Sequence, residues 1–239
     1  MTVLLAVQNL PLDKEVTVSS KAASQPGSPM ELKAGEIVTV EDLIYGAMLP
    51  SGNDAAYALG EAVSGDMDSF VQLMNKTAAN IGCENTHFAN PSGLQNKRHY
   101  TTAYDMMLIT RAALSNDIIR KAAGAQSYTV EKTNKSEKRT LKTHIEFLTD
   151  EDSGVYAGKT GYWSDYDCSI ALGYSQDGLD LYIVLLGDTA EQRSEDVKKL
   201  IRYANETIDG VKVVGKNKAM GKVRIKHGAK TRLETYTSE

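Results

Sequence analysis

The sequence that decides the fold lies at residues 157–186 and runs AGKTGYWSDYDCSIALGYSQDGLDLYIVLL. It contains three apolar segments separated by short polar turns, which is the pattern of neighbouring antiparallel strands. The pair Asp177-Gly178, between the second and third segments, is a strong signal for a β-hairpin. We therefore predict an antiparallel meander with strands at 157–163, 168–174 and 179–186.

Helical patterns flank this meander on both sides. After it, Thr189 is expected to cap a helix that runs to about Ile208 and turns one apolar face toward the sheet. Before it, apolar residues recur at helical spacing behind caps such as Thr39 and Thr102. The fold class is therefore α/β (α+β), an antiparallel sheet flanked by helices. Helices are predicted at 1–10, 39–48, 54–63, 67–81, 102–114 and 117–123, and further strands at 15–20, 127–131 and 138–147.

The last part of the chain has a different pattern. From Gly210 onward it shows short β segments, at 211–214 and 222–226, with basic residues interleaved. A unit of roughly thirty residues buries too little apolar surface to offset its ordering entropy. We predict one large domain over residues 1–209 and the start of a small β-rich domain over 210–239.

Composition excludes several classes of function. The net charge of -4 and the pI near 5.7 provide no basic field for nucleic acid. The two cysteines, Cys83 and Cys168, lack metal-site or redox spacing, and the four histidines are scattered, so no metal and no cofactor are implied. The apolar run Val3–Val7 is too short for a membrane span or a signal peptide.

Two short motifs carry the candidate chemistry. Ser51-Gly52-Asn53 lies between two predicted helices, and Lys159-Thr160-Gly161 lies on the first strand of the meander. Together with S-x-x-K, such motifs form the set found in class A β-lactamases and penicillin-binding proteins. The resemblance extends to LPSGNDAA at 49–56, THFANPSGL at 86–94 and HYTTAYD at 99–105.

Through these blocks the chain resembles the serine-type D-alanyl-D-alanine carboxypeptidases, the low-molecular-mass penicillin-binding proteins. The likeness covers most of residues 1–210 and implies a β-lactamase/transpeptidase-like fold. It also implies catalytic roles for three residues. Ser51 would relay a proton to the departing D-alanine, Asn53 would hold the peptide amide, and Lys159 would add positive charge beside the relay.

The same resemblance implies a substrate-binding strand. The Thr160 hydroxyl would bind the terminal carboxylate of the substrate, and Gly161 would let the substrate approach the backbone. The backbone N–H of Tyr162 would stabilise the oxyanion. His144, on the preceding strand, matches a position where the family often has a polar residue that contacts substrate. Trp163 and Tyr166 are placed at the mouth of the cleft, or pack against the strand.

The chain departs from the family pattern at its first residues. In the family, S-x-x-K is followed by an aliphatic residue and Met-Thr, and this chain opens with Met1-Thr2. The nucleophilic serine and its lysine are therefore expected shortly before Met1, in a longer protein that also carries an export signal. Without them, the chain is expected to be inactive.

The implied function is removal of the terminal D-alanine from peptidoglycan stem peptides through an acyl-enzyme, with β-lactam antibiotics as inhibitors. The full-length protein would act outside the cytoplasm, secreted or associated with the outer face of the membrane. Two alternatives remain open. A class A-like β-lactamase needs a water-activating glutamate that the sequence does not show, and a degenerate peptidoglycan-binding protein would have lost its nucleophile.

Overall fold

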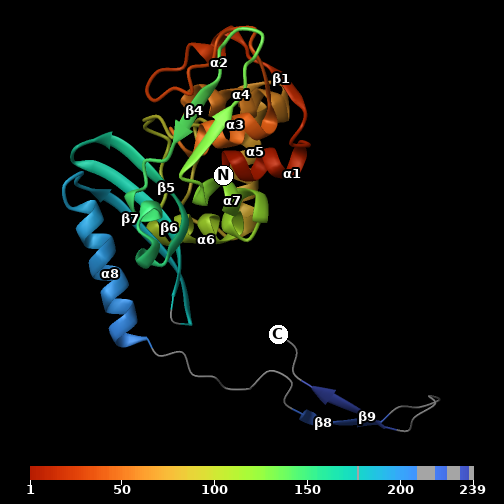
Figure 1. Cartoon of the computed structure of the whole chain (residues 1–239), viewed down its shortest axis with the longest axis vertical. Coiled ribbons are helices and arrows are strands. Elements are labelled where there is room, and N and C mark those ends of the chain that lie inside the picture. The colour runs from red at the N-terminus through yellow and green to blue at the C-terminus, as the bar shows by residue number, and fades with distance from the viewer. Residues whose placement is uncertain (177, 209–218, 225–231, 237–239) are drawn as a thin grey trace.

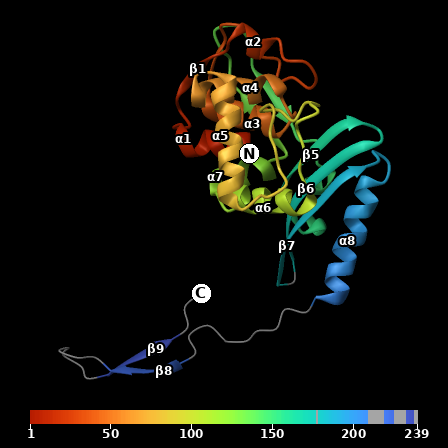
Figure 2. The same ribbon diagram turned by 180° about the vertical axis from the view of Figure 1, so that it is seen from behind.

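The computed structural model describes residues 1–176, 178–208, 219–224 and 232–236. Within residues 1–208, a group of helices from the first half of the chain lies beside a three-stranded sheet from the second half (Figures 1 and 2). This sheet is antiparallel and helices pack against it, which confirms the predicted fold class.

The predicted meander is confirmed. Strands β5 (Val155–Ser164), β6 (Asp167–Gln176) and β7 (Leu179–Asp188) pair antiparallel in that order. The pairing of β5 with β6 sets Thr160 opposite Ile170 and shifts register between Tyr162 and Ser164, which is a β-bulge. Asp177, half of the predicted hairpin signal, lies outside the described residues.

Helices cover both faces of this sheet. On one face, α8 (Arg193–Thr207) packs the buried Val197 against a cluster that includes Leu172 and Tyr174. On the other, α6 (Ala103–Leu114) and α7 (Asp117–Gly124) contact the strands, and the ends of these helices form a small core with Ala157 of β5. The strand β5 is one edge of the sheet and faces the helical group (Figure 1).

The helical group has its own core. Its main helices are α1 (Thr2–Asn9), α3 (Val40–Met48), α4 (Asn53–Ser64) and α5 (Met67–Ile81), with the short helix α2 (Ser20–Ala23). Two small antiparallel pairs border it, β1 (Glu15–Thr17) with β2 (Ile37–Thr39) and β3 (Ser127–Val130) with β4 (Arg139–Lys142). The predicted cap at Thr39 is confirmed as a capping box with Asp42.

A buried carboxylate fixes the start of α4. The Asp54 side chain is 2% exposed and accepts hydrogen bonds from the backbone N–H groups of Met30, Leu32 and Ala55 at 2.8–3.1 Å. It therefore holds the loop that contains residues 26–32 against the first turn of the helix. Without it, the two loop donors would be buried with no partner.

Within residues 1–208, three predicted boundaries differ clearly from the structure. The strand predicted over 138–147 ends at Lys142, and residues 146–149 form a 3₁₀ helix that buries Phe147; a second 3₁₀ turn covers Glu151–Ser153. The helix expected to start after Thr189 begins at Arg193, because the Thr189 hydroxyl accepts from the N–H of Gln192 in a separate turn. The strand β1 ends at Thr17, and Ser19 caps α2 instead of continuing the strand.

The C-terminal part contains one described hairpin, β8 (Ala219–Arg224) with β9 (Arg232–Tyr236). The strand predicted at 222–226 thus starts earlier than expected, and the one at 211–214 lies outside the described residues. The division into domains at 209/210 stays a prediction. Among the described residues, no helix has both the length and the apolar character that a bilayer span requires.

Replacing Asp54 by alanine is expected to lower the free energy of unfolding by about 3 kcal/mol, because several buried backbone donors lose a charged acceptor. Urea denaturation followed by circular dichroism measures this. The matched control is Asp68→Ala on the exposed start of α5, with an expected change of about 0.5 kcal/mol or less. Equal effects of the two substitutions would contradict the anchoring role of Asp54.

Candidate active site

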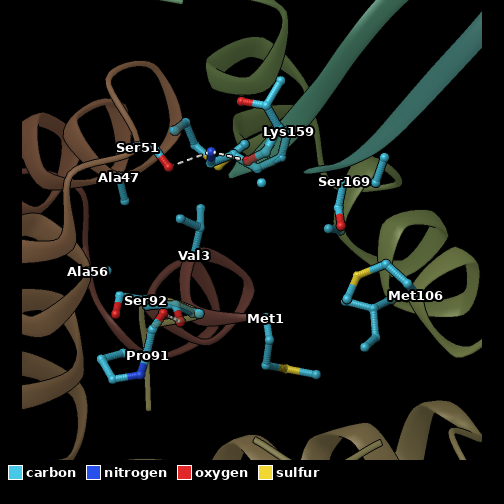
Figure 3. A pocket seen from close by; sticks show the side chains of 18 of the residues that line it. Met1, Val3, Ala47, Ser51, Ala56, Pro91, Ser92, Met106, Lys159 and Ser169 are labelled. Carbon is cyan, nitrogen blue, oxygen red and sulfur yellow. Dashed lines mark hydrogen bonds between the residues drawn. The ribbon is translucent and has the colours of Figure 1, made fainter. Parts of the chain in front are cut away.

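A pocket of about 760 Å³ lies where the helical group meets strand β5 (Figure 3). Helix α1 contributes Thr2 and Val3, the α3–α4 connection contributes Ser51, α4 contributes Asn53, and β5 contributes residues 158–163. Two elements that are far apart in the sequence therefore bring both predicted motifs to one cavity. Other lining residues include Phe88, Asn90, Pro91, Ser92, His99, His144, Ser169 and Leu186.

Ser51 has an unusual backbone conformation. It follows the end of α3 and has φ +61°, in the left-handed region that non-glycine residues seldom occupy. The residue is not the cap of α4, because Gly52 is the N-cap. Such strain at a pocket wall is typical of a functional position. It directs the Ser51 hydroxyl across the pocket toward β5 (Figure 3).

The two motifs meet in one hydrogen bond. The Lys159 ammonium donates to Ser51 Oγ at 2.7 Å and to the carbonyl oxygen of Thr160 at 2.7 Å. Desolvation, and secondly repulsion from the Arg193 guanidinium, lower the pKa of Lys159 from 10.5 to about 8. This lysine can therefore donate or accept a proton near neutral pH, next to a hydroxyl that can pass the proton on.

Asn53 lies at the same wall but has a different partner. It is buried at the first position of α4, and its Nδ2 donates to the carbonyl oxygen of Pro26 at 2.7 Å. Gly27, with φ +86°, passes so close that an added Cβ would lie 2.5 Å from Nδ2. Only glycine fits this turn, so the 26–32 loop fixes the orientation of the Asn53 amide.

The predicted binding strand lines the pocket at the edge of the sheet. Thr160, Gly161 and Tyr162 all border the cavity. An added Cβ at Gly161 would meet only Ser169, at 3.4 Å or more, so packing within the chain does not itself require glycine there. The Tyr162 side chain is 68% exposed, and its hydroxyl donates to Asp165 Oδ1 at 2.9 Å.

Sequence reasoning missed Arg193. Its guanidinium donates to the carbonyl oxygens of Gly161 and Ser169 at 3.3 and 3.5 Å, which ties the start of α8 to strands β5 and β6. His144 does line the pocket, and burial followed by repulsion from Lys159 lowers its pKa. Lys159, with Arg193 nearby, thus makes one wall of the pocket positive, which suits an anionic ligand, whereas the lowered pKa favours the uncharged form of His144.

The 86–94 block forms the opposite wall. Asn75 of α5 pairs with both backbone groups of Phe88, and Thr2 Oγ1 donates to the carbonyl oxygen of Pro91 at 2.6 Å. The Asn90 carboxamide accepts from the N–H groups of Ser92 and Gly93. These bonds hold Pro91 and Ser92 beside α1 in the cavity (Figure 3). The spacing of apolar residues in the sequence did not predict this wall. The wall is nevertheless formed by residues 86–94, one of the sequence blocks that carry the family resemblance.

Comparisons with known proteins show which family the chain resembles. A family model described as D-alanyl-D-alanine carboxypeptidase, peptidase S11, matches residues 1–190. The chain belongs to this D-alanyl-D-alanine carboxypeptidase family. It is 32% identical to the carboxypeptidase DacF of Bacillus subtilis, with all of the chain and 62% of that protein aligned. A Streptomyces D-alanyl-D-alanine carboxypeptidase is also 32% identical, over 84% of the chain and 74% of the relative.

Solved structures with related names are similar to this chain in fold. The crystal structure of a Streptomyces DD-transpeptidase matches with a TM-score of 0.79 and 29% identity, covering 86% of this chain and 84% of the other. A D-alanyl-D-alanine carboxypeptidase from Mycobacterium tuberculosis matches with a TM-score of 0.78 and 27% identity, covering 87% and 80%. The chain spans less than two thirds of the length of the Bacillus subtilis relative.

The lowered pKa of Lys159 has a consequence for stability. The unfolded chain binds this proton more tightly than the folded one. The free-energy cost of burying the charged Lys159 is therefore at its maximum below pH about 8. That destabilisation disappears as the pH rises from about 8 toward 10.5. Lys159→Met is therefore expected to raise the free energy of unfolding at pH 7 by about 1–2 kcal/mol, net of the lost hydrogen bonds.

Urea denaturation at a series of pH values tests this. The difference between Lys159→Met and the native chain is expected to shrink across that alkaline window. The exposed Lys76→Met on α5 is the control and is expected to change stability by about 0.5 kcal/mol or less at every pH. A loss of stability at pH 7 with an unchanged pH profile would show that Lys159 is not desolvated.

Proposed function

We propose that this chain provides the proton relay and the carboxylate-binding strand of a serine-type D-alanyl-D-alanine carboxypeptidase. The observation that carries the proposal is the hydrogen bond between Lys159 and Ser51 across the pocket. It joins the two motifs in a cavity with a positive wall, as a substrate that ends in a carboxylate requires. Membership of the peptidase S11 family supports the same reaction class.

The substrate is a peptidoglycan stem peptide that ends in D-Ala-D-Ala. Its terminal carboxylate binds the Thr160 hydroxyl in the positive field of Lys159 and Arg193. Its scissile carbonyl oxygen then points to the backbone N–H of Tyr162, which stabilises the developing oxyanion. Asn53 contacts the peptide amide, and Gly161 leaves room for the substrate along β5.

The reaction also requires the serine and lysine of a Ser-x-x-Lys motif, and no serine in residues 1–239 is followed by lysine at the third position. Helix α1, which begins at Thr2, lines the pocket, so a segment joined there enters beside Ser51. The serine attacks the carbonyl between the two D-alanines. Its proton passes through the lysines and Ser51 to the amine of the leaving D-alanine, and water then hydrolyses the acyl-enzyme.

β-Lactam antibiotics acylate the same serine and inhibit the enzyme. Peptidoglycan lies outside the cytoplasmic membrane, so the protein acts there. The direct test joins a Ser-x-x-Lys segment to Met1 and measures D-alanine release from an acylated peptide that ends in D-Ala-D-Ala. Release that depends on the added serine supports the carboxypeptidase, whereas substrate binding without release would favour the degenerate peptidoglycan-binding protein.

Residues 1–239 alone are expected to form no covalent adduct with a fluorescent penicillin, because Ser51 relays protons in this mechanism and does not attack. Intact-protein mass spectrometry checks this after prolonged incubation with excess antibiotic. The version with the added Ser-x-x-Lys is the positive control and should gain one acyl group per chain. A stoichiometric adduct on Ser51 would instead make Ser51 the nucleophile.

In the extended protein, Thr160→Val is expected to lower kcat/KM for D-alanine release by about tenfold to a hundredfold, because one charge-assisted hydrogen bond to the carboxylate is lost. Acylation by penicillin should fall less, since the strained lactam depends less on positioning. Valine keeps the β-branched shape that suits the strand. Both rates are measured on one preparation, and equal losses would assign Thr160 to a step common to both reactions.

A further inference from the structure

Three exposed aromatic side chains lie within five residues at one end of the pocket. Tyr162 is 68% exposed, Trp163 51% and Tyr166 83%, although large aromatic side chains are normally buried at least in part. Tyr162 and Trp163 line the pocket itself, and Tyr166 follows in the two-residue turn between β5 and β6. We call these three residues the aromatic rim.

The rim is held in place by the backbone. The β-bulge between Tyr162 and Ser164 leaves Trp163 as the extra residue of β5, and such bulges redirect side chains at the ends of strands. The Tyr162 hydroxyl donates to Asp165, and the Asp165 carbonyl oxygen accepts from the N–H of Ala190 at 2.8 Å. The turn is thus tied to the segment before α8, so the backbone that carries the three rings is ordered before binding.

The direction of the proposed substrate leads to this rim. With the carboxylate at Thr160 and the scissile carbonyl at Tyr162, the rest of the stem peptide continues along β5 toward Trp163. An extended peptide of five residues spans about 16 Å. The four residue-to-residue steps of strand between Thr160 and Ser164 span about 13 Å. The end of the peptide that is attached to sugar therefore arrives at the turn that contains Tyr166.

The chemistry of the rim suits a sugar. Aromatic faces attract the weakly positive C–H groups of a pyranose ring, and carboxylates accept hydrogen bonds from its hydroxyls. Residues 162–167 include Asp165 and Asp167 and no lysine or arginine, which disfavours an anionic partner such as nucleic acid or acidic lipid. We propose that the aromatic rim binds the N-acetylated sugar chain that carries the stem peptide. This inference rests on the proposed function for its geometry.

The test uses a sugar without any peptide. Trp163 is the only tryptophan in the sequence, so its fluorescence reports on the rim alone. Titration of the full chain with chitotetraose, an N-acetylglucosamine oligosaccharide, is expected to give a saturable change in emission at millimolar sugar. Tyr166→Ala should weaken binding about threefold to tenfold, whereas Tyr166→Phe, which keeps the ring, should stay within about twofold of the native chain.

The matched control is Tyr203→Ala on α8, which removes another exposed tyrosine and is expected to leave the titration unchanged. No saturable change up to the solubility limit of the sugar would overturn the proposal, and so would equal binding by Tyr166→Ala. A response to vesicles of anionic lipid in place of sugar would overturn it as well. The titration needs no nucleophile, so the two proposals can fail separately. Sugar binding without D-alanine release in the extended protein would refute the proposed enzyme function and would still support the aromatic rim as a sugar-binding site.

Discussion

The carboxylate of Asp54 is the constraint on which the helical side of the site depends. It is buried at the first turn of α4 and accepts from three backbone N–H groups, two of them in the loop that precedes α3 by several residues. That loop holds Gly27 and the Pro26 carbonyl against the Asn53 amide. The position of Asn53, and of Ser51 two residues earlier, follows from this one charged group and its geometry.

On the other side of the pocket, the buried positive charge of Lys159 lowers the stability of the fold. Lys159 lies close enough to Arg193 that repulsion between the two positive charges adds to desolvation in lowering the pKa of the lysine. A fold selected for stability alone would separate such charges. In the proposed function a carboxylate ligand neutralises these charges, so the unliganded protein would carry a destabilisation that binding removes.

The sequence predicts the elements that depend on local patterns. The three strands of the meander and the capped start of α3 are predictable because alternation and capping are local properties. The motifs at Ser51 and Lys159 are recognised by resemblance. The strained φ of Ser51, the bond from Asn53 to Pro26 and the contact of Arg193 with Gly161 are not predictable in this way, because each depends on residues that only the fold brings together. The early end of β4 escapes prediction because Phe147 is buried by a 3₁₀ turn instead of a strand.

The bond between Ser51 and Lys159 joins two separately packed cores. Ser51 belongs to the helical group, and Lys159 belongs to a strand whose sheet packs against α8 and against the ends of α6 and α7. A slight sliding of the sheet along these helices therefore changes the distance between Nζ and Oγ directly. In the proposed relay, substitutions at packing positions outside the pocket lining, such as Leu172 or Val197, can thus alter the rate of proton transfer without removing any group that handles the proton or the substrate.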